Sequence, residues 1–268
     1  MKMNTFKYRF ADNIYTKQNL AKYTWFGVGG NAELLYIPED EISLEKFLKE
    51  KPNDCSVFTI GAGSNLLVRD NGINGITLIT NKLNKISIDK DGIITASCGA
   101  IDAEVARFAR DHSRTGLEFL IGIPGTVGGG IKMNAGCFER EFKDILISVQ
   151  AVDKSGQVFT IPAKDINFKY RDSQLSDDLI FLSASFKGYR KEKKLIENEM
   201  KLLKEKKEKT QPTRIKTSGS TFKNPVDQSN KKVWQLIKES VPLEKSFGDA
   251  SISEKHCNFF VNKGNAKF

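Results

Sequence analysis

The sequence predicts an α+β protein. Short apolar runs bounded by Gly, Asn or Asp alternate with segments of helical spacing, and their spacing is too irregular for a parallel doubly wound sheet. The chain has 268 residues, 39% hydrophobic and 28% charged, which is typical of a globular protein with one large domain or two ordinary ones. This composition excludes a disordered chain and a membrane-embedded one.

The individual elements follow from local patterns. Apolar runs between turn residues predict strands at 32–37, 57–60, 76–79, 93–97 and 181–186, and a hairpin whose strands are 145–153 and 158–161. Helical spacing predicts helices at 42–49, at 103–112 with Asp102 as its cap, and near 232–239. A lysine-rich amphipathic helix after residue 190 ends at Pro212. The composition changes near residue 190, where we expect a domain boundary.

The formal charge of +9 is concentrated in one segment. Residues 187–216 contain twelve Lys or Arg and five Glu, a net +7. No aromatic residue follows Tyr189 among these lysines, so the segment lacks a platform for stacking bases. We expect a solvated helix face and no nucleic-acid partner, although a phosphorylated small molecule could still be favoured nearby.

The cysteines and histidines do not predict a metal site. Cys55, Cys98, Cys137 and Cys257 form no CxxC pair, and the two histidines stand alone. We expect reduced thiols that are buried or partly buried. No apolar run approaches the roughly 18 residues of a membrane span, and the first twenty residues lack the apolar core of a secretory signal. We therefore expect a cytoplasmic protein with no membrane partner.

Two glycine-rich segments are candidates for ligand binding. Residues 59–68 run from a strand into a small glycine turn whose exposed amides could cradle a pyrophosphate, although a plain turn would have the same sequence. Residues 116–136 hold seven glycines among mostly apolar residues. Such a segment indicates a main chain approached closely by something flat or bulky, either a ligand or the protein's own packing.

Two short polar sets complete the series. Residues 168–173 place Arg171 beside an aromatic residue, which suits a bidentate contact with a carboxylate. Residues 217–225 gather hydroxyls, a lysine and an amide around a glycine turn. Each set alone is more often a surface ion pair or a turn than a site.

In order along the chain, these segments resemble the UDP-N-acetylenolpyruvoylglucosamine reductases (UDP-N-acetylmuramate dehydrogenases) of bacterial cell-wall synthesis. The resemblance covers nearly the whole chain: TWFGVGGNA at 24–32, IGAGSNLLV at 60–68, GIPGTVGGGIKMNAG at 122–136, YRDS at 170–173, GSTFKNP at 219–225, and residues 247–262. The short interval between Arg171 and Ser220 resembles the shorter subtype, which lacks an inserted substrate loop.

The resemblance implies non-covalent FAD, with NADPH as co-substrate, in a vanillyl-alcohol-oxidase/p-cresol-methylhydroxylase-type fold. Two FAD-binding lobes would occupy residues 21–190, after an N-terminal extension at 1–20, and a smaller α+β substrate domain would occupy 191–268. The pyrophosphate would lie on Gly61, Ala62, Gly63, Ser64, Asn65 and Leu66. The flavin would lie against Ile123, Pro124, Gly125, Thr126, Gly128, Gly129, Asn134 and Ala135.

The resemblance also implies roles in the reaction. NADPH would reduce the flavin and leave, and the UDP-sugar would then enter the same cleft and be reduced to UDP-N-acetylmuramate for peptidoglycan synthesis. Arg171 matches the family's enolate-stabilising arginine and Ser220 its proton donor. Tyr170, Lys223 and Asn224 are candidates for holding the substrate carboxylate or diphosphate. We expect a monomer.

One family feature finds no match. The family uses a glutamate near its C-terminus, but no Glu follows Glu254 here, so we expect a truncated substrate domain or an incomplete catalytic set. Three alternatives stay open at this point: a remnant that binds FAD or UDP-sugar with little turnover, an FAD-dependent oxidase of the same fold, and a polyanion-binding protein.

Overall fold

The structure is a computed structural model, and it describes residues 9–268. The chain divides into two compact units, each built from separate segments. Unit 1 comprises Met1–Gln18, Ala32–Ala62 and Asn74–Lys204, and unit 2 comprises Asn19–Asn31, Gly63–Ile73 and Glu205–Phe268. The first eight residues of the expected N-terminal extension lie outside the described part.

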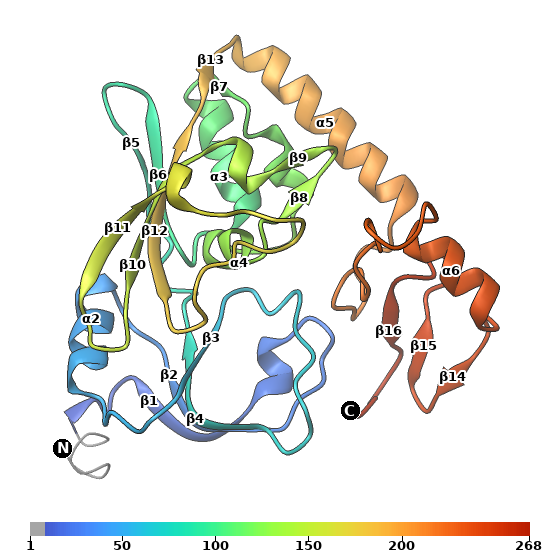
Figure 1. The fold of residues 1–268 in the computed structure, drawn as a ribbon, viewed down its shortest axis with the longest axis horizontal. Helices are drawn as coiled ribbons and strands as arrows, with labels where there is room; N and C mark the ends of the chain where they lie inside the picture. Colours follow the sequence, from blue (N-terminus) through green and yellow to red (C-terminus); the bar gives the residue numbers. More distant parts are fainter. Residues whose placement is uncertain (1–8) are drawn as a thin grey trace. The chain divides into compact units, whose positions relative to one another are not determined.

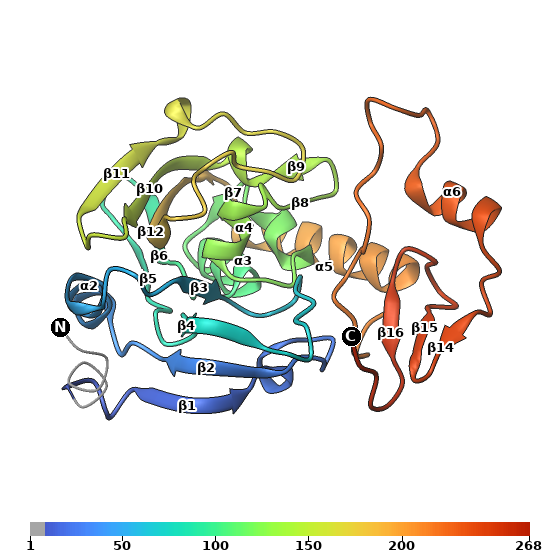
Figure 2. The same cartoon turned by 60° about the horizontal axis from the view of Figure 1, so that its bottom comes forward.

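A four-stranded sheet forms the N-terminal part of unit 1. Its strand order is β1 (Ile14–Asn19), β2 (Asn31–Tyr36), β4 (Ile73–Ile79) and β3 (Val57–Ile60) (Figure 2). Strands β3 and β4 are parallel, with Val57 opposite Ile76. Helix α2 (Glu41–Glu50) lies between β2 and β3 in sequence and begins with a capping box, in which the Ser43 amide donates to Asp40 Oδ1 at 2.7 Å. Its apolar face buries Leu44, Phe47 and Leu48.

A five-stranded antiparallel sheet forms the rest of unit 1 (Figure 1). Its order is β11 (Val158–Pro162), β10 (Leu146–Val152), β12 (Ile180–Lys187), β6 (Ile93–Ser97) and β5 (Ile86–Ile88). The predicted hairpin is confirmed, because β10 and β11 pair antiparallel with Val152 opposite Val158. The predicted strands at 57–60 and 93–97 have the observed bounds.

Helices and short hairpins pack beside this sheet. Helix α3 (Asp102–Asp111) and the short helix α4 (Val127–Lys132) contribute to one continuous hydrophobic core. Two-stranded pairs join β7 (Arg114–Thr115) to β13 (Tyr189–Arg190) and β8 (Gly136–Cys137) to β9 (Arg140–Glu141). The lysine-rich helix α5 (Lys193–Thr210) buries Ile196 and Met200 and ends before Pro212, as predicted.

The prediction that Asp102 caps α3 is wrong. Ile101 occupies the N-cap position and makes no side-chain cap hydrogen bond, and Asp102 is the first helical residue. Its side chain is fully buried, and neither carboxylate oxygen has a hydrogen-bond partner among the described residues. Burial raises the pKa of this carboxyl well above its ordinary value. A polar residue before an apolar helix is therefore not enough to identify a cap.

Unit 2 is assembled from distant segments. Its C-terminal part holds α6 (Val233–Ser240) and a three-stranded antiparallel sheet of β14 (Ser246–Phe247), β15 (Ala250–Ile252) and β16 (Phe260–Asn262). Asn262 Nδ2 donates to the Phe26 carbonyl at 3.0 Å, and the Gly30 amide donates to the Arg69 carbonyl at 2.9 Å. The contacts divide the chain within α5, between Lys204 and Glu205, whereas the sequence predicts a boundary near residue 190. The assignment of 191–268 as the substrate domain stays a prediction.

The four cysteines, all within the described residues, form no disulfide. Cys98 and Cys257 are buried and Cys55 and Cys137 are half-buried, as expected, and burial raises the pKa of Cys98 to about 12. Within residues 9–268, no three His, Cys, Asp or Glu side chains gather where they could hold a metal ion. In the same range, no helix has both the length and the apolarity needed to cross a membrane.

Candidate active site

The first glycine turn follows β3 directly and requires small residues. Within unit 1, a Cβ on Gly61 would lie 2.2 Å from Thr126 Oγ1. Within unit 2, Gly63 has φ +66°, and a Cβ there would lie 1.9 Å from the Tyr23 carbonyl oxygen. Both positions therefore exclude a side chain, Gly63 also because of its left-handed backbone. Of the remaining predicted pyrophosphate residues, Asn65 is exposed, whereas Ala62, Ser64 and Leu66 are half-buried.

The structure brings the two predicted cofactor segments together at Gly61 and Thr126. The Thr126 side chain is buried, and its hydroxyl has no hydrogen-bond partner among the described residues. The next residue, Val127, begins α4 and donates its amide to the Ala100 carbonyl at 2.9 Å. Close-packed glycines and a buried hydroxyl without a hydrogen-bond partner are typical of a segment that is shaped to bind a polar ligand. The residues present therefore fit FAD.

The glycines of α4 have different roles. A Cβ on Gly130 would lie 2.2 Å from Cζ of Phe142, and one on Gly128 would lie 3.2 Å from Cys98. At these two positions the close neighbour is the protein's own core, as the packing interpretation expects. Gly129 is exposed, and a Cβ there would meet only Thr126 Oγ1, at 3.7 Å. Pro124 is also exposed, Gly125 and Ala135 are half-buried, and Ile123 is buried.

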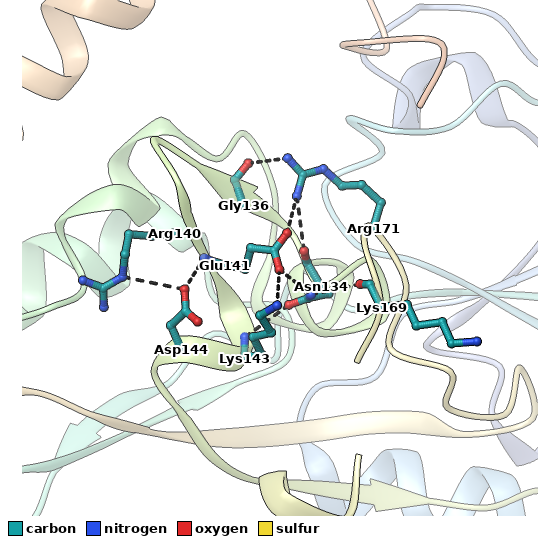
Figure 3. A network of polar contacts seen from close by, with 8 residues as sticks. All are labelled: Asn134, Gly136, Arg140, Glu141, Lys143, Asp144, Lys169 and Arg171. Atoms are coloured by element: carbon teal, nitrogen blue, oxygen red, sulfur yellow. Dashed lines mark hydrogen bonds and ion pairs between the residues drawn. The ribbon is translucent and has the colours of Figure 1, made fainter. Parts of the chain in front are cut away.

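Arg171 is the centre of a polar network in unit 1 (Figure 3). Its backbone has φ +57°, in a tight turn closed by hydrogen bonds of 2.8 and 3.2 Å between Lys169 and Asp172. Nη2 donates to the Gly136 carbonyl at 3.0 Å, and Nη1 donates to Glu141 Oε1 at 3.3 Å and to the Asn134 carbonyl at 3.5 Å. The guanidinium also lies 5.0 Å from the Tyr170 ring centroid. Arg171 is thus ordered by the glycine-rich segment itself.

The Asn134 side chain forms all of its hydrogen bonds within this network. Its side chain is fully buried and its φ is +38°. Nδ2 donates to Glu141 Oε2 at 2.9 Å and to the Lys169 carbonyl at 3.0 Å, and Oδ1 accepts from the Lys143 amide at 3.2 Å. Both amide hydrogens are therefore used within the chain. The structure gives this side chain a role in holding the Arg171 turn, and its direct contact with FAD stays a prediction.

In unit 2, Ser220 is exposed and belongs to a loop fixed by Asn258. Ser220 pairs as an isolated bridge with Phe259, and the Thr221 amide donates to the Asn258 carbonyl at 2.8 Å. The buried Asn258 amide group bonds Phe222 twice, accepting from its N–H at 3.0 Å and donating to its carbonyl at 2.9 Å. The Ser220 backbone is therefore held by its own bridge to Phe259 and by the contacts of the two residues that follow it.

The two other predicted substrate residues of this loop differ in their surroundings. Lys223 is exposed. Asn224 is half-buried, and its Oδ1 accepts from the Val233 amide at 3.0 Å, which satisfies one of the unpaired N–H groups at the start of α6. Asn224 therefore has a structural contact, whatever its part in binding substrate.

Sequence reasoning missed the roles of Glu141 and Asn258. Glu141 follows the glycine-rich segment in an unremarkable polar stretch, and nothing in its spacing indicates that it faces Arg171. Asn258 lies within the motif at residues 247–262, which was the available signal, but the motif alone suggests no contact with residues 221 and 222. Both roles depend on long-range pairing.

The fold and the two glycine segments define an FAD-binding protein of the vanillyl-alcohol-oxidase type, and the comparisons agree. Residues 32–162 match the family model described as "FAD binding domain". The solved structure of p-cresol methylhydroxylase with substrate bound aligns with a TM-score of 0.52 at 15% identity, over 70% of this chain and 42% of that one. At that identity the likeness concerns the fold alone.

Closer relatives identify the family. Residues 211–268 match the model described as "UDP-N-acetylenolpyruvoylglucosamine reductase, C-terminal domain". The UDP-N-acetylenolpyruvoylglucosamine reductase of Pelagibacter ubique is 53% identical, over 97% of this chain and 88% of its own length. The structure of the Thermus caldophilus UDP-N-acetylenolpyruvylglucosamine reductase aligns with a TM-score of 0.80 at 32% identity, over 94% of this chain and 89% of that one. The chain belongs to the UDP-N-acetylenolpyruvoylglucosamine reductase family, a family of flavin-dependent oxidoreductases.

Proposed function

We propose that the chain catalyses the NADPH-dependent reduction of the enolpyruvyl ether of UDP-N-acetylglucosamine to UDP-N-acetylmuramate, a step of peptidoglycan precursor synthesis. Family membership supports the reaction, and the Arg171 network supports the way in which this chain performs it. The chemistry that bound FAD supplies is hydride transfer, from NADPH and then to the β-carbon of the enolpyruvyl group. We place the enzyme in the cytoplasm as a monomer.

The chain's own residues would hold the cofactor. The amides of the 61–66 turn suit a pyrophosphate, because glycines at 61 and 63 keep side chains away from the backbone donors. The Thr126 hydroxyl, without a partner among residues 9–268, can serve as one further hydrogen-bonding group. The flavin would lie against the segment from Ile123 to Ala135, where Gly129 is exposed.

The observation that supports the mechanism most directly is the fixed position of the Arg171 guanidinium. Hydride addition at the β-carbon places negative charge on the α-carbon and its carboxylate, and a fixed cation lowers the energy of that charge. Three of the five guanidinium N–H donors are used on oxygens of residues 134, 136 and 141. Nε–H and the second Nη2–H make no hydrogen bond within the described residues. These two donors are what a substrate carboxylate needs.

Ser220 would then deliver a proton to the α-carbon. A serine hydroxyl is a weak acid, so this step requires a strongly basic carbanion and a fixed geometry. The paired hydrogen bonds of Asn258 to Phe222 supply such a geometry for the loop. Tyr170, Lys223 and Asn224 would bind the substrate's carboxylate or diphosphate.

Stopped-flow spectroscopy tests the function in two half-reactions. NADPH should bleach the bound flavin, and UDP-N-acetylenolpyruvoylglucosamine should restore its colour in the absence of oxygen. A flavin that NADPH does not bleach, or that the substrate does not reoxidise, would refute the proposal. Peroxide formation with a small alcohol would instead indicate an oxidase. Light scattering of the purified holoenzyme tests the monomer.

A further inference from the structure

We propose that Glu141 is a positioning residue that fixes the Arg171 guanidinium for the reaction. This inference rests on the role proposed above for Arg171. The carboxylate is the one charged partner that Arg171 has within residues 9–268, with Nη1 and Oε1 3.3 Å apart. The other two acceptors, the carbonyls of Asn134 and Gly136, are neutral.

Glu141 is itself held firmly. It pairs with Gly136 across the β8–β9 hairpin, and its amide donates to Asp144 Oδ2 at 2.8 Å. Its second carboxylate oxygen accepts from Asn134 Nδ2 at 2.9 Å and contacts Lys143 Nζ at 3.0 Å (Figure 3). The Glu141 side chain is only 19% exposed. A carboxylate held by two other groups, on a residue whose backbone is also fixed, can in turn hold the Arg171 guanidinium.

The hairpin offers Arg171 two acceptors at once. Gly136 and Glu141 lie opposite each other, so a carbonyl oxygen from one strand and a carboxylate from the other meet the same guanidinium. A Cβ on Gly136 would lie 2.8 Å from Glu141 Cγ and 3.0 Å from Arg171 Nη1. Glycine at this position is therefore what allows the arginine to approach the hairpin.

The arginine needs this support because of its own geometry. The Arg171 side chain is 30% exposed and has several rotatable bonds, so the carbonyls alone leave it free to adopt other rotamers. A displacement of about 1 Å at a reacting centre can cost on the order of 100-fold in rate. Yet the negative charge of Glu141 also weakens the attraction of Arg171 for an anionic substrate. Glu141 thus favours the rate while opposing substrate binding.

Glu141→Gln separates these two effects, because it removes the charge and keeps the size. We expect flavin reoxidation by the enolpyruvyl substrate to slow by about 10- to 100-fold. Flavin reduction by NADPH should stay within about threefold of the wild type, as expected for a group that acts only on the second half-reaction. The dissociation constant of the substrate for the oxidised holoenzyme, read from the flavin absorbance, should be unchanged or lower.

Two further variants serve as controls. Glu139→Gln makes the same change at an exposed acid in the turn between β8 and β9, and it should leave both half-reactions within about threefold of the wild type. In an Arg171→Lys background, Glu141→Gln should cost less than about threefold, because no guanidinium is left to position. A wild-type reoxidation rate in Glu141→Gln would overturn the inference. So would a parallel loss of both half-reactions and of binding, which would show a general structural role. Failure of the wild-type chain to be reoxidised would instead refute the proposed function.

Discussion

Gly61 and Thr126 approach so closely that a methyl group on Gly61 would lie 2.2 Å from the Thr126 hydroxyl oxygen. The two residues come from the two glycine segments that the sequence assigns to one cofactor. The next nearest Thr126 atom to such a methyl group is Cβ, at 3.4 Å, which is an ordinary van der Waals contact. The clash is therefore confined to a single hydroxyl.

This relationship predicts a rescue. Gly61→Ala should lower the free energy of unfolding of the apoprotein by about 1–3 kcal/mol, because it overfills a packed site. Thr126→Ala should be nearly neutral, since the hydroxyl has no hydrogen-bond partner within the described residues. The double variant should recover most of the lost stability, because the obstructing atom is gone. Urea unfolding of all four proteins measures the coupling, and strictly additive effects would contradict the close contact.

Asp102→Asn tests the buried carboxyl of α3 through its pH dependence. The folded-state pKa is raised by burial, whereas the unfolded chain titrates near 3.9. At a pH between these two pKa values, the Asp102 carboxyl has lost its proton in the unfolded state but keeps it in the folded state. The wild type should therefore lose stability relative to the variant, by about 1.4 kcal/mol per pH unit, as the pH rises from about 4 toward the folded-state pKa. Below pH 4 the difference should be constant.

Unfolding free energies at pH 5, 6, 7 and 8 measure that slope. Glu104→Gln is the matched control, because Glu104 is an exposed acid in the first turn of the same helix and pairs with Arg107. Its stability difference from the wild type should vary little over this range. An equally flat profile for Asp102→Asn would show that the carboxyl ionises normally.

Ser220→Ala tests the proposed proton donor. We expect flavin reduction by NADPH to be preserved and reoxidation by the enolpyruvyl substrate to slow by about 10²–10⁴-fold, the usual contribution of a general acid. Single-turnover stopped-flow measures both steps. Ser218→Ala removes another hydroxyl of the same turn and should leave both rates near those of the wild type. If Ser220→Ala slows both half-reactions equally, the variant has a folding defect.

Local patterns predicted much of unit 1. The strands at 57–60 and 93–97 and the hairpin of β10 and β11 are apolar runs between turn residues, and such runs form strands in most surroundings. Strand β1 (Ile14–Asn19) was missed because its sequence, IYTKQN, is mostly polar and exposed. Its place at the edge of a sheet comes from pairing with β2, which no local pattern reveals.

The sequence predicted which segments form the candidate site, but it did not predict which of their side chains contact one another. The glycine turns and the arginine stood out by composition, whereas the pairing of Arg171 with Glu141, 30 residues away, depends on how β8 and β9 meet. The same holds for Asn134, whose left-handed backbone and buried amide serve the Arg171 turn. A sequence indicates which residues carry chemistry more readily than which residues hold them in place.

Unit 2 is built from segments that lie far apart in the sequence, which has a consequence for synthesis on the ribosome. At about 5–20 residues per second, residues 19–31 and 63–73 emerge well before residues 205–268, with which they form one unit. The hydrogen bond between Gly30 and Arg69 can form early, but the hydrogen bond from Asn262 to the Phe26 carbonyl can form only after residue 262 has been synthesised. A ribosome that stalls near residue 204 therefore holds a nascent chain with every segment of unit 1 and only the first two segments of unit 2. Until translation resumes, the early segments of unit 2 lack the contacts that residues 205–268 provide.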